Sequence, residues 1–350
     1  MKKKFNILVL VHPDLIPPQS VSNKKVFHKE FIPWKTEFDV ITTLKEMGHQ
    51  VLILGLSESF DELEDLLDSI KIDLVFNLIE EFKGKSEFDY QVAEFLERRR
   101  VPFTGCHSRA LILGRDKGRS KVIARQQGVR VPEFKVFRKG KKINLEKMNL
   151  QFPMIVKCLK EESSYGLSKK SVVKNKKSLL DRIKYVHKTL GVDCIVEEFI
   201  EGDEVYLGYS GGEKAKVLSP RKLYFSKSST PAKEIYTSKA KWSYSYARRQ
   251  KIHTRHFSGN ELLVKRLVKA TKIICESMDV DAQARVDFRI DKNGQIFFLE
   301  VNPNPNLAKD DDFALAALRE VKSYQHVIKS ILELALKRKN SRKRVEKLAA

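Results

Sequence analysis

The sequence predicts an α/β protein with a Rossmann-like N-terminal domain followed by two α+β units. In residues 1–115, apolar runs with the length of buried strands alternate with helical patterns. This alternation is typical of a parallel sheet covered on both faces. Beyond this region, helices alternate with short strands and turns. A length of 350 residues is enough for two or three domains with their own cores.

The first domain is expected to contain four buried strands. They are FNILVLV, QVLILGL, IDLVFNLI and VPFTGC, separated by helices in TEFDVITTLKEMG, SFDELEDLLDSI and SEFDYQVAEFLERRR. Ser59 and Glu62 have the spacing of a capping box. The segment after the first strand, VHPDLIPPQS, is rich in proline and lacks the glycine fingerprint of dinucleotide-binding domains, so no nicotinamide cofactor is expected.

The central unit is expected over residues 116–196. Its first helix begins at the N-cap Asp116 and ends at Gly128. A strand in FPMIVKCL, a loop in EESSYGLSKK, a strand in SVVKN and a helix in SLLDRIKYVHKTLG follow. Residues 197–336 form the third unit, which includes a basic stretch at 213–256 without regular pattern, and residues 337–350 form a basic tail.

The composition restricts the class of protein. No apolar run approaches the roughly 18 residues of a membrane helix, and the start MKKKFNILVLV has no small-residue cleavage site, so it is interpreted as a strand. Four scattered cysteines without metal-binding spacing fit a reducing, cytoplasmic location. The net charge of +22 favours anionic partners, namely nucleotides, acidic substrates or nucleic acid. For the tail, a lysine-rich surface that only aids solubility is an equal alternative.

A hairpin near the C-terminus predicts a metal site. The runs ARVDFRI and FFLEVNPNP alternate in polarity and flank Asn293-Gly294, a strong two-residue turn signal. Such a turn places Asp287 opposite Glu300, Arg285 opposite Asn302 and Phe288 opposite Leu299. Opposed like charges destabilise a hairpin, whereas two acids and an amide oxygen suit Mg²⁺. The alternative is a solvated face whose acids are neutralised by Arg285 and Arg289.

Other features fit a phosphate-bearing ligand, each with a simpler alternative. Lys157 lies within the apolar strand PMIVKC and Lys121 in the preceding helix; lysines suit phosphate oxygens but also occur as surface residues. The loop 163–166, SSYG, allows close approach of backbone N–H groups to an anion, or is an ordinary turn. Glu197 and Glu204 flank a reversal that suits an adenine edge and a ribose, or is an acidic hairpin.

Six motifs in this order resemble the ATP-grasp superfamily, and within it the D-alanine–D-alanine ligases and their relatives. They are FNLIEEF, VPFTGC, GRDKGRSK, IVKCLKEESSYG, VEEFIEGDE and RVDFRIDKNGQIFFLEVNPNP. The resemblance covers nearly the whole chain. It implies three α/β domains, a two-part ATP-grasp fold, ATP bound between the second and third domains, and Mg²⁺ or Mn²⁺. It also allows a homodimer through the N-terminal domain.

The resemblance implies roles for individual residues. By position, Lys121 and Lys157 resemble the phosphate-binding lysines, and Ser163, Ser164 and Gly166 the lid over the phosphates. The remaining assignments are the adenine hinge (Glu197, Glu198, Phe199, Ile200), the ribose ligand (Glu204), the mobile-loop lysine (Lys241), the arginine that steadies the acyl intermediate (Arg285) and the metal ligands (Asp287, Glu300, Asn302). The implied reaction joins a small-molecule carboxylate to an amine through an acylphosphate.

The substrate half of the motif pattern departs from the dipeptide ligases. VHPDLIPPQS lacks their glycine-rich turn and glutamate, EEFKGKSEFDY replaces a histidine- and glycine-containing stretch, and Asn306 and Asp311 occupy the positions of a glycine and a substrate-binding serine. We therefore expect substrates other than two D-alanines. Asp311 favours a cationic amine unless Lys309 or Arg319 neutralises it.

Two further hypotheses stay open. One is a genuine D-alanine–D-alanine ligase. The other is a polyanion-binding protein on an inactive scaffold, for which the stretch KWSYSYARRQKIHTRH, with aromatic residues between basic ones, suits single-stranded nucleic acid.

Overall fold

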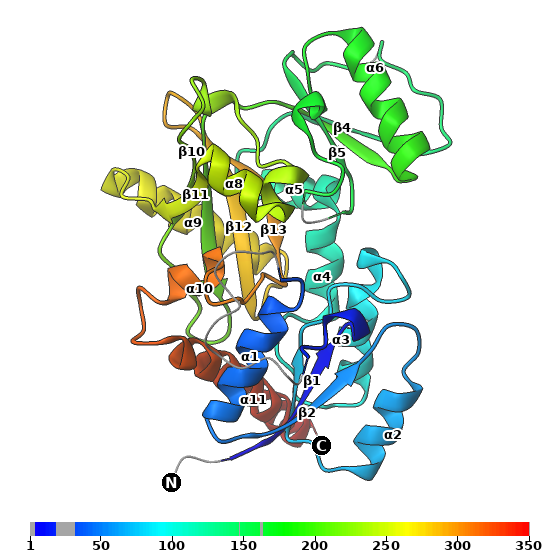
Figure 1. Cartoon of the computed structure of the whole chain (residues 1–350), viewed down its shortest axis with the longest axis vertical. Coiled ribbons are helices and arrows are strands. Elements are labelled where there is room, and N and C mark those ends of the chain that lie inside the picture. Colours follow the sequence, from blue (N-terminus) through cyan, green and yellow to red (C-terminus); the bar gives the residue numbers. More distant parts are fainter. Residues whose placement is uncertain (1–3, 19–31, 147, 162–163, 350) are drawn as a thin grey trace.

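The computed structural model describes residues 4–18, 32–146, 148–161 and 164–349, with side chains described as far as residue 338. The described chain forms three sheets stacked along the long axis, with the N-terminal sheet at the bottom of Figure 1 and the central sheet at the top. This arrangement agrees with the predicted α/β class.

The N-terminal sheet is parallel, with the strand order β2-β1-β3. Its strands and helices are β1 (Asn6–Val11), α1 (Lys35–Glu46), β2 (Gln50–Gly55), α2 (Asp61–Ser69), β3 (Leu74–Asn77) and α3 (Asp89–Arg98). Alternate residues of β1 pack in two separate cores, one with α1 and the other with α2 and α3. The predicted covering of both faces is therefore confirmed.

Three local expectations for this unit are wrong. The strand β2 lies at the sheet edge, where Leu52 and Ile53 are 38% and 36% exposed instead of buried. VPFTGC forms only a single parallel bridge, between Val75 and Phe103, because it meets β3 at one point. The helix α2 begins after Phe60, and no side chain caps it.

The central sheet is antiparallel, with the order β4-β7-β5-β6. Its elements are β4 (Phe134–Phe137), β5 (Met154–Cys158), β6 (Val172–Val173), α6 (Lys176–Tyr185) and β7 (Cys194–Glu198), and α6 continues as a π-helix over Val186–Leu190. Gly191 ends this helix with a φ of +77°, as predicted. The apolar side of α6 closes a small core against β5 and β7.

The C-terminal sheet carries most of the site and has the order β11-β10-β8-β12-β13, with β9 paired to β8. Its strands are β8 (Asp203–Ser210), β9 (Lys216–Val217), β10 (Arg221–Phe225), β11 (Ile252–His256), β12 (Gln283–Ile290) and β13 (Ile296–Asn302). The helices α4 (Ser108–Arg115), α5 (Lys117–Gln126) and α9 (Glu261–Ser277) share its core. The stretch 213–256, expected to lack regular structure, instead supplies β9, β10, α7 (Ser238–Trp242), α8 (Tyr244–Gln250) and β11.

The hairpin of β12 and β13 reaches the predicted acid pairing by a different route. Asp287 pairs with Glu300 and Arg285 with Asn302, as expected, but Phe288 pairs with Phe298. The turn has three residues, 292–294, because Asp291 pairs with Gln295 and Gly294 adopts a φ of +71°. A β-bulge at Leu299 then absorbs the extra residue and restores the predicted register at Asp287.

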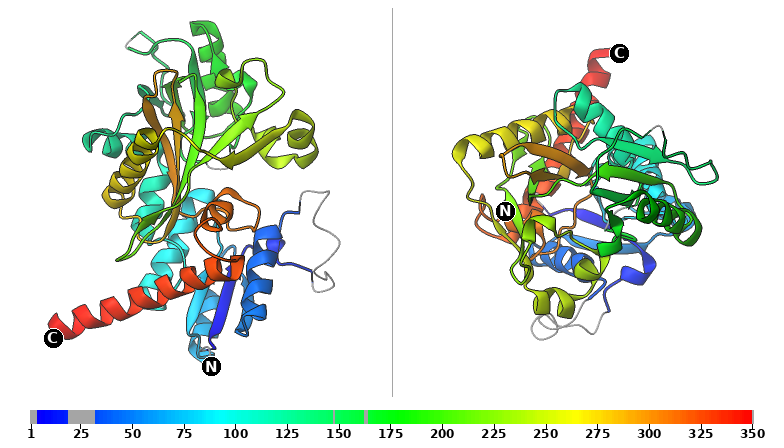
Figure 2. Two further views of the ribbon diagram at one scale, coloured as in Figure 1. Left: turned by 90° about the vertical axis from the view of Figure 1, so that its left-hand side faces the viewer. Right: turned by 90° about the horizontal axis from the view of Figure 1, so that it is seen from above.

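The end of the chain folds back onto the beginning. The helices α10 (Asp312–Ala317) and α11 (Tyr324–Ala349) pack with β1 and α1 in one core, and Figure 2 shows α11 running beside the N-terminal sheet and projecting beyond it. Arg338 is tied to Asp281 at 2.7 Å and to the carbonyls of Phe103 and Gly105. The expected boundary at residue 336 therefore falls inside a helix that covers the first domain.

The structure also describes the state of the cysteines and the character of the helices. All four cysteines are buried, and none is disulfide-bonded. Among the described residues, none of the helices combines the length and apolarity that crossing a bilayer requires.

Candidate functional site

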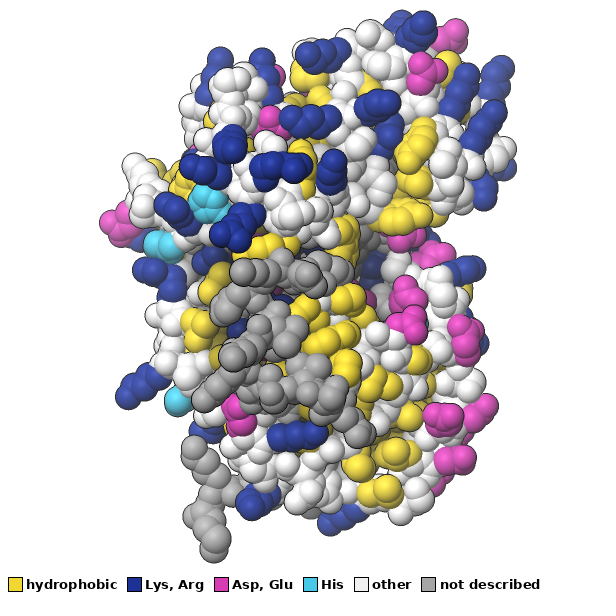
Figure 3. Space-filling view, viewed as in Figure 1, with side chains coloured by type: hydrophobic (Ala, Val, Ile, Leu, Met, Phe, Trp, Pro, Cys, Tyr) yellow, Lys and Arg dark blue, Asp and Glu magenta, His cyan; other side chains and the backbone are white. Residues whose placement is uncertain are grey.

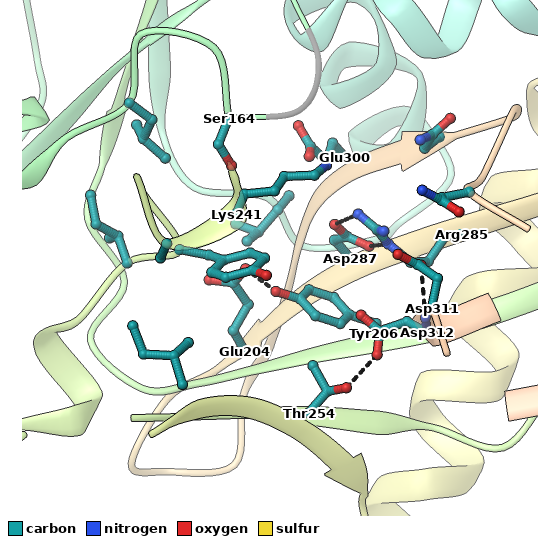
Figure 4. A pocket seen from close by; sticks show the side chains of 18 of the residues that line it. Ser164, Glu204, Tyr206, Lys241, Thr254, Arg285, Asp287, Glu300, Asp311 and Asp312 are labelled. Carbon is teal, nitrogen blue, oxygen red and sulfur yellow. Dashed lines mark hydrogen bonds and ion pairs between the residues drawn. The ribbon is translucent and has the colours of Figure 1, made fainter. Parts of the chain in front are cut away.

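A cavity of about 940 Å³ is lined by β5 and β7 of the central sheet and by β8, β10, β12 and β13 of the C-terminal sheet. It brings together most of the predicted site residues, namely Lys157, Ser164, Glu197, Glu198, Phe199, Ile200, Glu204, Lys241, Arg285, Asp287, Glu300, Asn302, Asn306 and Asp311. Figure 4 shows the labelled ones around the open space. Lys121 and Gly166 do not line the cavity, and Ser163 lies outside the described residues.

The facing acids Asp287 and Glu300 lie in different electrostatic surroundings. Arg285 binds Asp287 through two bonds of 2.8 and 2.9 Å. Burial nevertheless raises the pKa of Asp287 to about 6, and the charge of Glu300 adds to this effect. Burial also raises the pKa of Glu300, but nearby cations, above all Lys117 at 3.3 Å, outweigh it and hold the pKa at about 2. The surroundings therefore stabilise the charged form of Glu300 and disfavour the charged form of Asp287.

This donor set fits Mg²⁺. Within the described part of the chain, no three acidic, histidine or cysteine side chains converge as a metal site, so a cation here would use two carboxylates and the Asn302 amide oxygen. Mg²⁺ commonly keeps waters and binds one or two carboxylates plus substrate phosphates.

Glu197 is a buried carboxylate shared by two lysines. Its oxygens lie 3.0 Å from Lys121 and 2.9 Å from Lys157, and its own side chain is 1% exposed. Burial raises the pKa of Glu197, but the two lysines together lower it below its usual value. Burial lowers the pKa of Lys157, and Glu197 and Glu300 more than compensate, so its ammonium group remains charged at the cavity wall.

The prediction for Lys121 needs correction. Its side chain is 0% exposed and also donates to the carbonyl of Leu299, the bulge residue of β13. A group without exposed surface cannot contact a phosphate in this arrangement. Lys117 lines the cavity instead, and its ammonium group lies between the Glu300 carboxylate and the Glu161 carbonyl. Lys121 connects α5 to the hairpin and fixes Glu197.

The loop predicted as a lid has its own conformational requirements. Ser164 and Gly166 adopt φ values of +59° and +67°. A Cβ at Gly166 would lie 2.3 Å from the Leu190 Cδ1 methyl group, which would have to move, and the left-handed conformation itself favours glycine. Only Ser164 of these two lines the cavity. The role of Gly166 is therefore to shape the loop.

The hinge residues face the cavity, but part of their backbone is already used. The amides of Glu198 and Phe199 donate to the carbonyls of Glu133 and Pro153, each at 2.9 Å. Arg289, which is 3% exposed, donates to the carbonyl of Ile200 at 2.9 Å. The same arginine lies 3.1 Å from the Glu204 carboxylate.

Glu204 is therefore already ion-paired within the protein. Its second oxygen accepts from the Tyr206 hydroxyl at 2.8 Å. The carboxylate is held at the cavity wall by two neighbours, so a ribose there would meet an acceptor of fixed orientation.

At the other end of the cavity, three consecutive aspartates begin α10. Asp310 is ion-paired with Lys35, and Asp312 lies 2.8 Å from Arg221 and also accepts from the Thr254 hydroxyl. Asp311 caps α10 by accepting from the Asp312 amide at 2.7 Å. Burial raises the Asp311 pKa to about 6, with a further contribution from Asp312.

The two cations proposed to neutralise Asp311 do not pair with it. Lys309 lies 3.6 Å from Asp39 instead, and Arg319 follows the end of α10 at an exposed position. The cations that act on Asp311 are Arg285 and Lys241. Nearby, Asn306 accepts from the Thr36 hydroxyl at 2.9 Å.

A family model described as the D-ala D-ala ligase C-terminus matches residues 123–333. The chain belongs to the D-alanine–D-alanine ligase family. The D-alanine–D-alanine ligase of Aquifex aeolicus (strain VF5) is 30% identical over 86% of this chain and 94% of that relative. An uncharacterised protein, y4sG, of Sinorhizobium fredii is also 30% identical, over 87% and 90% of the two chains.

Solved structures of this family share the fold. The ligase of Bacillus anthracis complexed with ATP superimposes with a TM-score of 0.73 at 20% identity, covering 97% of this chain and 99% of that one. The VanG D-Ala:D-Ser ligase of Enterococcus faecalis gives 0.68 at 19% identity, over 95% and 100%. The chain is thus an ATP-grasp protein of the D-alanine–D-alanine ligase family and an ATP-dependent ligase that forms carbon–nitrogen bonds.

Sequence reasoning missed several polar residues of this ligase-like site. Lys117 directly follows the N-cap Asp116, and that position was a usable signal because it is the start of a helix. Arg289 was considered only in the alternative of a solvated face, as a charge that neutralises the acids, whereas it is buried beside Glu204. Arg221 and Thr254 lie in a segment without recognisable pattern, so the sequence offered no signal for them.

Proposed function

We propose that this chain joins a carboxylate to an amine through an acylphosphate, and that its substrates are not two D-alanines. One observation carries the proposal: the same cavity gathers the lysines, the arginine and the paired acids that phosphoryl transfer to a carboxylate requires. Its opposite end has aspartates where the related ligases are expected to bind a substrate carboxylate.

The nucleotide half of the cavity is assigned as follows. Glu197–Ile200 border the adenine, Glu204 accepts from the ribose, and Lys157 and Lys117 approach the phosphates, with Ser164 in the covering loop. A lysine about 4 Å from a phosphate contributes roughly 4 kcal/mol at an effective dielectric near 20. The Glu197 carboxylate keeps the Lys157 ammonium charged and oriented.

Asp287, Glu300 and Asn302 would hold the cation. Mg²⁺ bound there supplies charge neutralisation for the transferring phosphoryl group. Arg285 is held by Asp287 and faces the cavity beside Asp311. From that position its guanidinium can donate to the oxygen that becomes negative when the amine attacks the acyl carbon.

The proposed reaction has two steps. The substrate carboxylate attacks the γ-phosphorus, the bond to the β-phosphate oxygen breaks, and ADP leaves. The amine then attacks the acyl carbon, phosphate leaves, and the amide nitrogen loses a proton. Lys241, on the short helix α7 over the cavity, is placed to cover the phosphates and exclude water, which would otherwise hydrolyse the acylphosphate.

Asp311 sets the expected choice of amine. Two negative charges about 4 Å apart oppose each other by roughly 4 kcal/mol at an effective dielectric of 20, which disfavours an amine substrate with a free carboxylate at this point. Neither Lys309 nor Arg319 is paired with Asp311 within the described residues. A group that bears a positive charge, such as the side-chain amine of a basic amino acid or an amine of a polyamine, suits the position better.

The test measures ADP release with Mg·ATP in the presence of D-alanine, lysine, arginine or polyamines. The wild type is expected to prefer the cationic amines, and Asp311→Ser to lose that preference. Asp310→Ser is the control, because the Asp310 carboxylate is already paired with Lys35. Efficient dimerisation of D-alanine by the wild type would contradict the altered specificity.

The Aquifex aeolicus relative supports the second candidate, a genuine D-alanine–D-alanine ligase, and the ADP-release assay with D-alanine distinguishes the two candidates.

The N-terminal unit exposes Leu52 and Ile53 on its edge strand. A homodimer through this unit is the assembly that light scattering should test.

A further inference from the structure

Three exposed cations that line the cavity have no carboxylate partner among the described residues. They are Arg248 of α8, Lys251 at the C-cap of α8, and Arg255 of β11. In the described part of the chain, no ion pair or hydrogen bond from their side chains to a carboxylate is found. The other cavity cations that are ion-paired with carboxylates are Lys35, Lys117, Lys157, Arg221, Arg285 and Arg289. We call Arg248, Lys251 and Arg255 the basic strip.

The basic strip begins beside the substrate end of the cavity. Thr254, which precedes Arg255 in β11, donates to Asp312, and Arg221 donates to the Thr254 hydroxyl at 2.8 Å. Figure 4 shows Thr254 and Asp312 joined below Asp311 and Arg285. In Figure 3, Lys and Arg side chains gather on the face over α8 and β11. Side chains alternate along β11, so that of Arg255 points away from the face of Thr254. The strip adjoins the reaction end because its three residues line the same cavity as Arg285 and Asp311.

Aromatic surface accompanies these charges. Trp242 and Tyr244 line the cavity and are 46% and 50% exposed. Such rings give an extended ligand a flat apolar contact next to the cations. Charges that face no acid contribute a net positive potential, which attracts an anionic ligand.

We infer that the basic strip binds the body of an acidic peptide whose C-terminal carboxyl is the group activated in the cavity. The inference rests on the proposed function and names the class of its acyl substrate. The position of the strip argues for a peptide over a nucleic acid, because it leads to the arginine and acids that would activate a carboxyl. Asp311 at the far end would then receive the cationic amine that is joined to this peptide.

The experiment compares binding of two fluorescent peptides, hexaglutamate and hexaglutamine, to the full chain by anisotropy. The strip variant combines Arg248→Gln, Lys251→Gln and Arg255→Gln. The control combines Lys174→Gln, Lys176→Gln and Lys177→Gln, which removes the same charge from exposed positions around the start of α6, away from the cavity. At Lys251, whose φ is +51°, glutamine meets the same backbone strain as lysine.

The wild type is expected to bind hexaglutamate at least tenfold more tightly than hexaglutamine, with a difference that shrinks as salt screens the charges. The strip variant should lose tenfold or more in hexaglutamate affinity, and the control less than twofold. Hexaglutamate should also stimulate ADP release when a cationic amine is present.

Other outcomes would overturn the inference. Equal losses in both variants would reduce the effect to overall charge. A strip variant that loses ATP affinity and keeps hexaglutamate affinity would assign the strip to the nucleotide. A single-stranded oligonucleotide of equal charge that binds more tightly than the peptide would favour nucleic acid. Strip-dependent peptide binding with no ADP release for any amine would instead contradict the proposed ligase reaction.

Discussion

At the scale of single residues, Glu197 is ion-paired with two lysines that have different roles. Lys121 has no exposed surface, whereas Lys157 lines the cavity. Both approach Glu197 within about 3 Å, as their ion pairs of 3.0 and 2.9 Å show. Both are lysines paired with the same carboxylate, so their different roles follow from their different burial.

Lys121→Met is expected to destabilise the fold, and Lys157→Met to weaken nucleotide binding. Removing one partner of a buried pair costs about 3 kcal/mol, which urea unfolding would measure. Lys157→Met should lower Mg·ATP affinity tenfold or more, each decade being about 1.4 kcal/mol, and calorimetry would measure it. Lys117→Met should resemble Lys157→Met. A Lys121→Met protein of normal stability without ATP affinity would contradict the assignment.

Asp311→Asn is expected to stabilise the nucleotide-free protein at neutral pH. The Asp311 pKa is raised from 3.8 to about 6, so the folded protein retains a proton that the unfolded chain loses between these values. Stability contributed by protonated Asp311 is therefore present below about pH 4 and lost as the pH rises through 6. Asparagine stays uncharged and still caps α10.

The stability gain of Asp311→Asn should be on the order of 1–2 kcal/mol at pH 7.5 and close to zero near pH 4. Urea unfolding at both pH values would measure it. Asp65→Asn, at an exposed position of α2, is the control. A variant less stable than the wild type at pH 7.5 would show that the Asp311 charge is compensated in the fold.

At the scale of elements, two local devices position the site. The β-bulge at Leu299 corrects the register of a three-residue turn and leaves a carbonyl that receives Lys121. The N-cap Asp116 accepts from Gly118 and Arg119 at 3.0 and 2.9 Å, and so starts α5 where Lys117 faces Glu300. The bulge therefore fixes the buried Lys121 beside Glu197, and the cap fixes Lys117 at the cavity wall.

Asp116→Ala is expected to cost about 1 kcal/mol of stability through the lost cap. It should also weaken Mg·ATP binding severalfold, because a frayed first turn leaves Lys117 without a fixed position. Asp116→Asn retains the acceptor and should behave as the wild type in both urea unfolding and calorimetry. Equal ATP affinity in all three proteins would mean that Lys117 does not act on the nucleotide.

At the scale of the whole molecule, the last helix belongs to the first domain. Ile328 of α11 is 0% exposed and shares a core with β1 and α1. The chain ends and begins in the same packing unit, and the two sheets around the cavity are inserted between them in sequence. The N-terminal sheet therefore depends on residues more than 300 positions away.

Ile328→Ala is expected to lower the free energy of unfolding by about 3 kcal/mol through the lost burial and the cavity left behind. Hydrogen exchange should show the loss of protection in β1 and β3 as well as in α11. Gln325→Ala, at an exposed position on the same helix, is the control. Loss of protection confined to α11 would contradict the shared core.

The sequence by itself determined what depends on neighbouring residues. The N-cap at Asp116, the strand β1 and the left-handed end at Gly191 were all predictable. The order of motifs further predicted the family. These features follow from local hydrogen bonding and from alternation along a strand, which a short segment contains in full.

Only the tertiary structure decided which side chains are covered. Patterns identified Leu52 and Lys121 as strand and helix residues, but β2 proved to be an edge strand and Lys121 a buried ion-pair partner of Glu197. The position of α11 and the role of Lys117 likewise depend on contacts with distant elements. Burial is a property of the packed molecule, because the atoms that exclude water from a residue come from segments far away in sequence.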